Sequence, residues 1–159
     1  MTSGHEIAMG LRAAYWSMHR QTNAHLASLG ATAEQFVVLA LLVEEDGITQ
    51  QELGRRATSD PNTIRAVLVL LEKRGLVSRR PHPTDGRAHC VTLTRKGRQA
   101  YEKWQARIEP LQNRLRDLFL SDEAAELVGF LHGISESMAE LNKRGGSDRP
   151  VTSDPAVDG

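Results

Sequence analysis

The spacing of apolar residues changes twice along this sequence, and each change limits what the chain can fold into. Up to Gly75 apolar residues recur every three to four positions, the spacing of one helix face. Over residues 76–80 and 89–93 the spacing falls to two, which indicates two short strands. From Thr94 the helical spacing returns. The sequence therefore predicts helices on either side of a single two-stranded hairpin.

Start and stop signals divide the first half of the sequence into four helices. Thr32 and Thr49 are each followed three residues later by Gln or Glu, which is the capping box that begins a helix. The pair at 59–60 precedes Pro61, and a proline costs no hydrogen bond at the first helical position. The predicted helices cover about 5–29, 32–45, 49–57 and 61–74, with stops near Gly30, Gly47 and Gly75. The residues expected to face a core are Phe36, Leu39, Val43, Leu53, Ile64, Val67, Leu68 and Leu71.

Two longer helices are predicted after the hairpin. Thr94 can cap the first, whose apolar stripe continues beyond Pro110, so this proline should kink the helix rather than end it. Ser121 is expected to cap the last helix, with two acidic residues in its first turn. That helix runs to about Lys143. Residues 144–159 show no core-forming pattern, which predicts a disordered tail.

Two short helices joined by a tight turn and followed by a hairpin form a winged helix-turn-helix. The expected fold class is mainly α with a two-stranded β-hairpin wing (α+β), with long N- and C-terminal dimerisation helices. The winged helix-turn-helix would span about 32–97 within a single domain of 1–143, and the dimerisation helices about 5–29 and 95–143. The apolar stripes of these outer helices are too wide for so small a centre, so we expect a second copy of the chain to cover them. The residues predicted for this interface are Ile7, Leu11, Leu111, Leu115, Leu118, Leu127, Phe130, Leu131, Ile134 and Met138.

Charge is segregated along the chain although it sums to zero. Residues 49–98 hold eleven Lys and Arg against four Asp and Glu, a net charge of +7, so the remainder carries −7. A charge run is usually a solvated surface. Here, however, the excess coincides with the helix and hairpin whose shape can enter a DNA groove. The sequence therefore predicts double-stranded DNA as the partner.

Three stretches and the spacing between them resemble the MarR family of bacterial winged-helix transcription regulators. They are "ITQQELGRRA", "TIRAVLVLLEKRGLVSRR" and "DGRAHCVTLTRKG". The resemblance spans 32–97, and the flanking helices fit in length and order. It implies a homodimer whose first, fifth and sixth helices interlock, with helix 61–74 in the major groove and wing tip 85–87 in the adjacent minor groove. It also implies a repressor of nearby genes, released by a small phenolic or other aromatic ligand or by oxidation.

The exposed face of the fourth helix and the wing tip carry side chains suited to reading DNA. Asn62 can pair with adenine and Arg65 with guanine, while Arg87 is long enough to reach a narrow minor groove. Phosphate would repel Asp85, which we expect to hold the Arg87 guanidinium instead. The residues predicted to contact DNA are Thr49, Gln50, Arg55, Asn62, Thr63, Arg65, Ala66, Val69, Arg79, Arg80, Asp85, Gly86 and Arg87. Several of these are small or apolar where relatives often carry polar or basic residues, which leaves the operator sequence open.

Aromatic residues on the outer helices have two interpretations. Trp16, His19, Tyr101 and Trp104 lie on helical stripes, where aromatic side chains are more often core. A flat aromatic effector also needs such walls, and His19 or Arg20 could pair with its carboxylate. These five residues form the candidate ligand site.

No catalytic chemistry is predicted. The sequence lacks the spacing of known nucleophile, phosphate-binding or paired-carboxylate motifs, and its six histidines have no partners at metal-ligand spacing. We therefore expect no enzyme activity, cofactor or metal site. The single cysteine, Cys90, excludes an internal disulfide. It is either an ordinary strand residue or a redox sensor whose thiol pKa is lowered by the cations of the wing.

The leading hypothesis is a homodimeric regulator at a pseudo-palindromic DNA site, with a small-molecule effector as a further partner. The alternatives are a winged-helix protein-interaction module and a redox-sensing regulator acting through Cys90. The N-terminus lacks the features of a signal peptide, and the longest apolar run, 36–43, is too short to cross a bilayer. We therefore expect no membrane partner and a cytoplasmic location in a bacterium, nucleoid-associated when bound.

Overall fold

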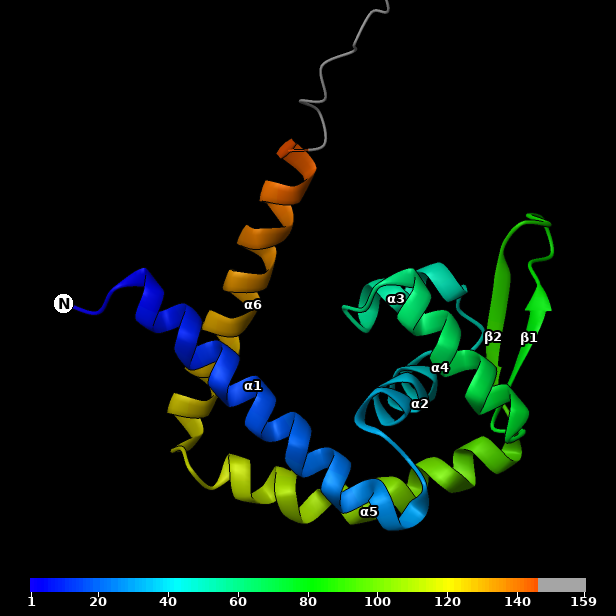
Figure 1. The fold of residues 1–159 in the computed structure, drawn as a ribbon, viewed down its shortest axis with the longest axis horizontal. Helices are drawn as coiled ribbons and strands as arrows, with labels where there is room; N and C mark the ends of the chain where they lie inside the picture. Colours follow the sequence, from blue (N-terminus) through cyan, green and yellow to red (C-terminus); the bar gives the residue numbers. More distant parts are fainter. Residues whose placement is uncertain (146–159) are drawn as a thin grey trace, which may run out of the picture. The chain divides into compact units, whose positions relative to one another are not determined.

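The computed structural model describes residues 1–145, and the chain divides into two compact units. The first unit runs from Met1 to Asn113 and the second begins at Arg114. In chain order the elements are α1 (Gly4–Leu26), the 3₁₀ helix η1 (Ala27–Leu29), α2 (Ala33–Glu44), α3 (Gln50–Arg56), α4 (Pro61–Lys73), β1 (Val77–Pro81), β2 (His89–Leu93), α5 (Arg95–Arg116) and α6 (Ser121–Gly145) (Figure 1). The described chain is thus mainly helical with one antiparallel hairpin, which confirms the predicted fold class.

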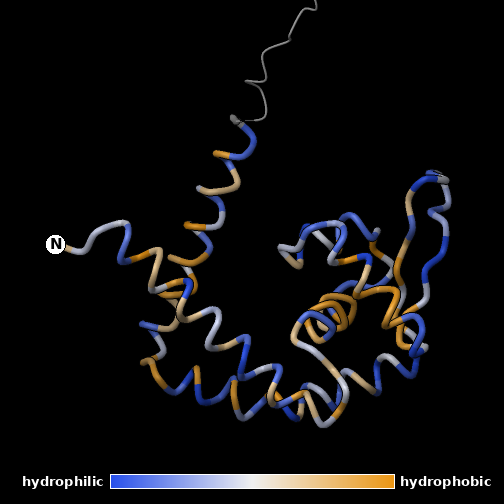
Figure 2. Tube along the Cα trace, viewed as in Figure 1, coloured by the Kyte–Doolittle hydropathy of each residue, from blue (hydrophilic) through white to orange (hydrophobic). Residues whose placement is uncertain are grey.

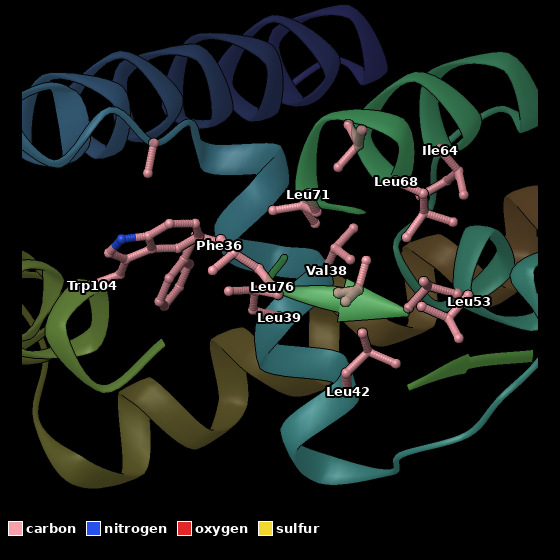
Figure 3. Packing of buried hydrophobic residues seen from close by; sticks show 14 of the residues in the cluster. Phe36, Val38, Leu39, Leu42, Leu53, Ile64, Leu68, Leu71, Leu76 and Trp104 are labelled. Carbon is pink, nitrogen blue, oxygen red and sulfur yellow. The ribbon is translucent and has the colours of Figure 1, made fainter. Parts of the chain in front are cut away.

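The core of the first unit forms around α2. Leu39 and Leu42 of this helix are completely buried, as are Leu68 and Leu71 of α4, and all four belong to one hydrophobic cluster (Figure 3). Most of α2 is coloured as hydrophobic in Figure 2, whereas the wing tip is coloured mainly as hydrophilic. Burying each of these leucines contributes about 2 kcal/mol. α2 is therefore the element on which the other helices of the unit pack.

The predicted core positions hold on α4 but are incomplete on α2. The four α4 residues expected to face inward are all buried: Ile64, Val67, Leu68 and Leu71. On α2, Phe36 and Leu39 are buried as expected, whereas Val43 is only half-buried. Val38 and Leu42 are also buried, although they fall outside the predicted stripe. A helix covered on several sides buries more than one stripe, which a single-face pattern underestimates.

Side-chain caps set the predicted helix boundaries. The hydroxyls of Thr32 and Thr49 each accept the backbone N–H three residues on, at 3.3 and 3.1 Å. Asp60 caps α4 directly before its proline. Gly30 and Gly75 follow their helices with φ of 62° and 71°, a conformation that costs glycine nothing.

The outer helices differ from the prediction at their ends. α5 continues through Pro110, as expected. Ser121 is the first residue of α6 rather than its cap, and the preceding Leu120 N–H donates to the Glu123 carboxylate at 2.8 Å. α6 runs to Gly145, so the first two residues of the predicted tail are helical. The rest of that tail lies outside the described residues.

The linker between α2 and α3 adds backbone hydrogen bonds to the base of the wing. Gly47 N–H donates to the Val91 carbonyl at 3.0 Å, and Val91 N–H donates to the Ile48 carbonyl at 2.8 Å. An antiparallel bridge also pairs Thr49 with Cys90. The start of α3 and the second strand of the wing are therefore held together through their main chains. No sequence pattern indicated this pairing.

In the part of the chain that the structure describes, no single helix is long and apolar enough to cross a bilayer. The segments Gly4–Leu29 and Ala33–Glu44 reach that threshold only when taken together, and they are bent by 85° at their junction.

Gly97, in the first turn of α5, has no room for a side chain. A Cβ there would lie 1.9 Å from the Leu76 carbonyl oxygen and 2.8 Å from Leu93 Cδ1. We predict that Gly97→Ala lowers the free energy of unfolding by at least about 2 kcal/mol, because α5 must move away from the base of the hairpin. Urea denaturation followed by circular dichroism measures this loss.

Gly10→Ala is the matched control, because a Cβ at this α1 position meets nothing within 4 Å. It should leave the free energy of unfolding unchanged or raise it by up to about 1 kcal/mol through helix propensity. Equal stabilities for the two variants would show that the close approach at Gly97 is not a constraint.

Candidate nucleic-acid interface

A tight turn between α3 and α4 sets the geometry of the helix pair. Thr58 in this turn has a φ of 52°, a left-handed conformation unusual for a β-branched residue. Ser59 N–H donates to the Gly54 carbonyl at 3.0 Å. The Gly54 position also lies against Ile64 of α4, since a Cβ there would be 3.4 Å from its Cγ1. The small residue lets α3 and α4 approach closely and fixes the angle at which α4 is presented.

The face of α4 that the core leaves uncovered is the predicted reading face. Asn62, Arg65, Ala66 and Val69 are exposed and Thr63 is half-buried. The Thr63 hydroxyl donates to the Asp60 carboxylate at 2.5 Å, so only its lone pairs remain available to a ligand. Val69 is 46% exposed, which places an apolar side chain where it could meet a thymine methyl group.

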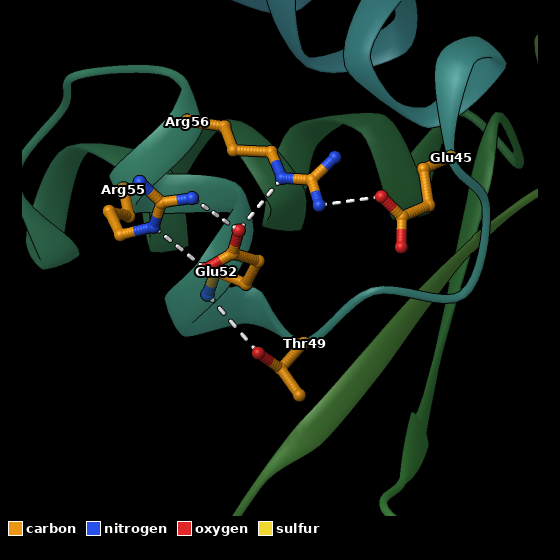
Figure 4. Close-up of polar contacts among 5 residues, drawn as sticks. All are labelled: Glu45, Thr49, Glu52, Arg55 and Arg56. Atoms are coloured by element: carbon orange, nitrogen blue, oxygen red, sulfur yellow. Dashed lines mark hydrogen bonds and ion pairs between the residues drawn. The ribbon is translucent and has the colours of Figure 1, made fainter.

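The Glu52 carboxylate binds two arginines of α3, and the network extends to Glu45 at the end of α2 (Figure 4). The Glu52 carboxylate accepts hydrogen bonds from Arg55 at 2.6 and 2.9 Å and from Arg56 at 2.8 Å. Arg56 also pairs with Glu45 at 2.5 Å. Hydrogen bonds from Arg55 and then Arg56 lower the pKa of Glu52 to about 2. The predicted DNA contact Arg55 is therefore bound to a carboxylate already.

A second carboxylate holds one of the two adjacent arginines of β1. Glu72 of α4 accepts hydrogen bonds from the Arg79 guanidinium at 2.6 and 3.0 Å, and these bonds lower the pKa of Glu72. Successive strand residues point to opposite faces, so Arg80 points away from this pair and is exposed. That Glu52 and Glu72 bind arginines was not predicted from the sequence. The spacing of Glu52 to Arg55 and Arg56, three and four residues, was a usable signal.

Among residues 1–145, three of the five arginines predicted to contact DNA have no carboxylate partner. They are Arg65 on α4, Arg80 on β1 and Arg87 in the wing loop, and all three are exposed. Arg74, another cation of residues 49–98, has a structural role. Its guanidinium donates to the Gly30 carbonyl at 2.8 Å and lies 5.4 Å from the Trp104 ring centroid. The eleven cations of residues 49–98 thus include arginines with structural partners and others that are exposed without a carboxylate partner, among them Arg65, Arg80 and Arg87.

The wing tip is held by hydrogen bonds within its own loop. The Asp85 carboxylate accepts the Arg87 backbone N–H at 3.0 Å. No contact between Asp85 and the Arg87 guanidinium occurs within the described structure, so the expected ion pair is replaced by a turn-capping bond. This arrangement fixes the turn and leaves the guanidinium exposed.

The five candidate ligand residues fall into two groups. On α1, Trp16 stacks edge-on against Tyr15 and His19 with centroid distances of 5.4 and 5.3 Å, and Trp16 is 41% exposed. His19 Nδ1 lies 3.6 Å from the carboxylate of Glu34 on α2. Arg20 is exposed next to them, and its guanidinium donates to the Ser17 hydroxyl at 3.4 Å. These α1 residues form an accessible aromatic and basic surface.

The two α5 aromatics instead belong to the core. Trp104 is 2% exposed, and Tyr101 stacks on Phe36 with a centroid distance of 5.8 Å. Trp104 still forms one wall of an open cleft of about 480 Å³, which is lined by Leu29, Arg74, Leu76, Lys96, Gln99, Ala100, Lys103 and Trp104. Of the predicted ligand residues, this cleft includes Trp104 alone.

The chain's single thiol and its histidines are spread over the first unit and α6. Cys90 is half-buried opposite Arg80 in the hairpin. Within residues 1–145, no three His, Cys, Asp or Glu side chains are grouped to hold a metal ion.

A tight helix pair, an exposed face on its second helix and a hairpin hydrogen-bonded to the linker before its first helix define a winged helix-turn-helix, the fold of a class of DNA-binding proteins. The model of the MarR family matches residues 31–89. The chain belongs to the MarR family of transcriptional regulators and is not an enzyme.

Relatives and solved structures agree with this assignment. The HTH-type transcriptional repressor Rv2887 of Mycobacterium tuberculosis is 33% identical over 95 residues, which cover 60% of this chain and 68% of the relative. A mutant MarR from E. coli, solved in complex with operator DNA, is 28% identical with a TM-score of 0.73 over 80% of this chain and 92% of its own. The PcaV regulator of Streptomyces coelicolor, solved with its natural ligand, is 26% identical with a TM-score of 0.71 over 86% and 94%.

The Glu52 network should give the stability of the first unit a defined pH dependence. Because the folded pKa lies below the ordinary value of 4.5, the network stabilises the fold above about pH 4.5 and is lost as pH falls towards 2. We predict that Glu52→Gln unfolds at a lower urea concentration than the wild type at neutral pH, and that this difference shrinks below about pH 4.5.

Glu44→Gln is the control, since Glu44 is an exposed carboxylate near the end of α2 that makes no ion pair in the described chain. It should leave the urea midpoint unchanged across the same range. A Glu52→Gln deficit that persists undiminished at low pH would contradict the assignment.

Proposed function

We propose that this protein is a homodimeric repressor that binds a pseudo-palindromic duplex and is released by a small aromatic acid. The observation that carries the DNA part is the exposed set Arg65, Arg80 and Arg87, which lie on the helix, strand and loop that a winged helix presents to DNA. The operator-bound E. coli relative supports the same partner. A cytoplasmic, nucleoid-associated location belongs to this proposal.

The proposed DNA contacts divide by chemistry. Asn62 and Arg65 on α4 are assigned to base edges in the major groove, with Thr63, Ala66 and Val69 completing that surface. Arg80 and Arg87 are assigned to the backbone and the minor groove, with Asp85 and Gly86 shaping the tip. Thr49 and Gln50 lie at the start of α3, where backbone N–H groups favour phosphate. Arg55 and Arg79 would reach phosphate only by exchanging a carboxylate for it.

Exposed apolar side chains on the outer helices support the dimer. Phe130 is 67% exposed, Met138 53% and Ile7 51%. Leu115, Leu118, Leu131 and Ile134 are also exposed, while Leu11, Leu111 and Leu127 are half-buried. Large exposed apolar surfaces are unfavourable in a monomer and mark interaction sites. A second copy is the partner that two separate half-sites on DNA require.

The α1 surface formed by Tyr15, Trp16, His19 and Arg20 is the proposed effector site. It offers aromatic walls and groups that can pair with a carboxylate, and the ligand-bound PcaV structure supports a small-molecule effector. Tyr101 and Trp104, the other two predicted ligand residues, lie in the core of the first unit. The connection of the α1 surface to α2 through His19 and Glu34 gives a ligand a route to the DNA-binding helices.

Arginines of the wing should set the salt dependence of DNA binding. We predict that Arg80→Ala and Arg87→Ala each weaken binding across all duplex sequences. Each should also reduce the slope of log affinity against log salt by about 0.9 for every phosphate that the variant no longer neutralises. The dimer should persist in size-exclusion chromatography. Fluorescence anisotropy with a labelled duplex at several salt concentrations measures the slope.

Arg107→Ala removes the same charge from an exposed position on α5, outside residues 49–98, and should leave the slope of log affinity against log salt unchanged. A flat salt response of the wild type would instead favour a winged helix that docks protein. Unchanged affinity in Arg87→Ala would remove the wing from the mechanism.

An aromatic carboxylate should bind at the α1 surface. In a thermal-shift screen of phenolic and benzoic acids, we predict at least one compound that raises the melting temperature and lowers DNA affinity. Trp16→Ala should abolish both effects, whereas Met18→Ala, another exposed α1 position, should retain them. If no aromatic acid produces either effect, the effector proposal is wrong.

A further inference from the structure

The wing loop between β1 and β2 is organised around the imidazole of His82. This residue stands between Pro81 and Pro83, and a residue before proline is restricted to extended conformations. Its backbone N–H donates to the Ala88 carbonyl at 2.9 Å, which continues the pairing of the two strands by one step. Pro83 therefore restricts the backbone of His82 to an extended conformation, and the contacts of the ring itself place it against residues 84–85.

The His82 Nδ1 atom accepts hydrogen bonds from the backbone N–H groups of Thr84 and Asp85, both at 3.2 Å. The Thr84 hydroxyl lies at the same distance. Backbone N–H groups can only donate, so Nδ1 carries no proton and the neutral ring holds its proton on Nε2. This is the bonding that an Asn or Asp side chain makes to the backbone two and three residues on.

The bonds of His82 complete the hydrogen bonding of the loop. Arg87 N–H is accepted by the Asp85 carboxylate and Ala88 N–H by the Asp85 carbonyl, at 3.0 and 3.1 Å. The Thr84 and Asp85 N–H groups have His82 as their acceptor. Within the described residues, the hydrogen bonds of loop 82–88 all stay inside the hairpin. The conformation that presents Arg87 therefore depends on two side-chain acceptors, the Asp85 carboxylate and His82 Nδ1, of which only the imidazole belongs to a residue type that changes charge near neutral pH.

We propose that His82 is a positioning residue for the wing, and that it holds the tip in its DNA-binding shape only while its imidazole is neutral. Protonation turns Nδ1 from an acceptor into a donor and removes the partner of two backbone N–H groups. Histidine changes charge between about pH 5 and 8. The other charged or titratable groups of the hairpin are Arg79, Arg80, Asp85, Arg87, His89 and Cys90. This inference rests on the proposed function, because a looser tip matters only if Arg87 meets DNA.

Three variants separate the acceptor from the charge. His82→Ala removes the acceptor, whereas His82→Asn keeps one that does not titrate. His89→Ala is the matched control, because His89 is an exposed histidine of the same hairpin with no side-chain hydrogen bond in the described chain. All three variants keep Arg79, Arg80 and Arg87, so the arginines of the hairpin are the same in every comparison.

DNA affinity is measured by anisotropy with a fluorescein-labelled mixed-sequence duplex. We expect His82→Ala to bind about fivefold more weakly at neutral pH with an unchanged salt slope, and His82→Asn and His89→Ala to bind like the wild type. As pH falls from about 7.5 to about 5.5, the wild type should lose affinity relative to His82→Asn. Wild-type affinity that rises relative to His82→Asn would overturn the proposal, because the imidazolium would then act as a phosphate contact.

A measurement without DNA distinguishes failure of this inference from failure of the proposed function. In ¹⁵N-NMR spectra of the free protein, the Thr84 and Asp85 amide signals should shift with the titration of His82 in the wild type and not in His82→Asn. Amide signals that ignore this titration overturn the positioning role. If the signals respond but the wild type ignores duplex DNA, the proposed function is wrong and only the ordering of the loop stands.

Discussion

The arrangement of the DNA-binding elements depends on the main chain of Val91. Its N–H and carbonyl both bond to the linker that enters α3, while its side chain is completely buried in the core. The wing therefore joins the helix-turn-helix by hydrogen bonds that are shielded from water, which makes them costly to leave unmade. Gly97 extends this junction, since its missing side chain lets α5 begin directly against the Leu76 carbonyl. Rigid placement matters because two reading elements can engage one duplex only at a fixed separation.

Carboxylate pairing distinguishes two groups of arginines within residues 49–98. Arg55, Arg56 and Arg79 are bound by carboxylates, so DNA would have to displace Glu52 or Glu72 to gain a contact from them. Arg65, Arg80 and Arg87 would have to lose only bound water to contact DNA. Net charge therefore overstates the number of phosphate contacts. The pair of Arg79 with Glu72 joins β1 to α4, the elements that carry the unpaired Arg80 and Arg65, so a structural arginine supports the proposed binding ones.

Local pattern predicted the elements well, and long-range contacts account for what it missed. The caps at Thr49 and Asp60 and the inward face of α4 follow from interactions within a few residues, which a sequence displays directly. The bonding of Ile48 to Val91 joins positions far apart in the chain, and no periodicity encodes it. The sequence favours a core position for Trp104 over a ligand contact without excluding either, and the packing of the first unit shows that it is buried. The sequence predicted which face of α4 is exposed. Which arginines are bound by carboxylates depends on the positions of Glu52 and Glu72 in the fold.

The contacts of α2 suggest how an effector could act on the reading helices without touching them. Glu34, in the first turn of α2, lies against His19 of the α1 surface, and Glu45, just beyond its end, binds Arg56 of α3. Between these ends α2 is packed into the core, and a close-packed interior transmits strain rather than absorbing it. A ligand that draws His19 away from Glu34 would break the contact between α1 and the first turn of α2. A displacement of α2 would then reach α3 through the Arg56 pair, and α4 through the close contact of Gly54 with Ile64.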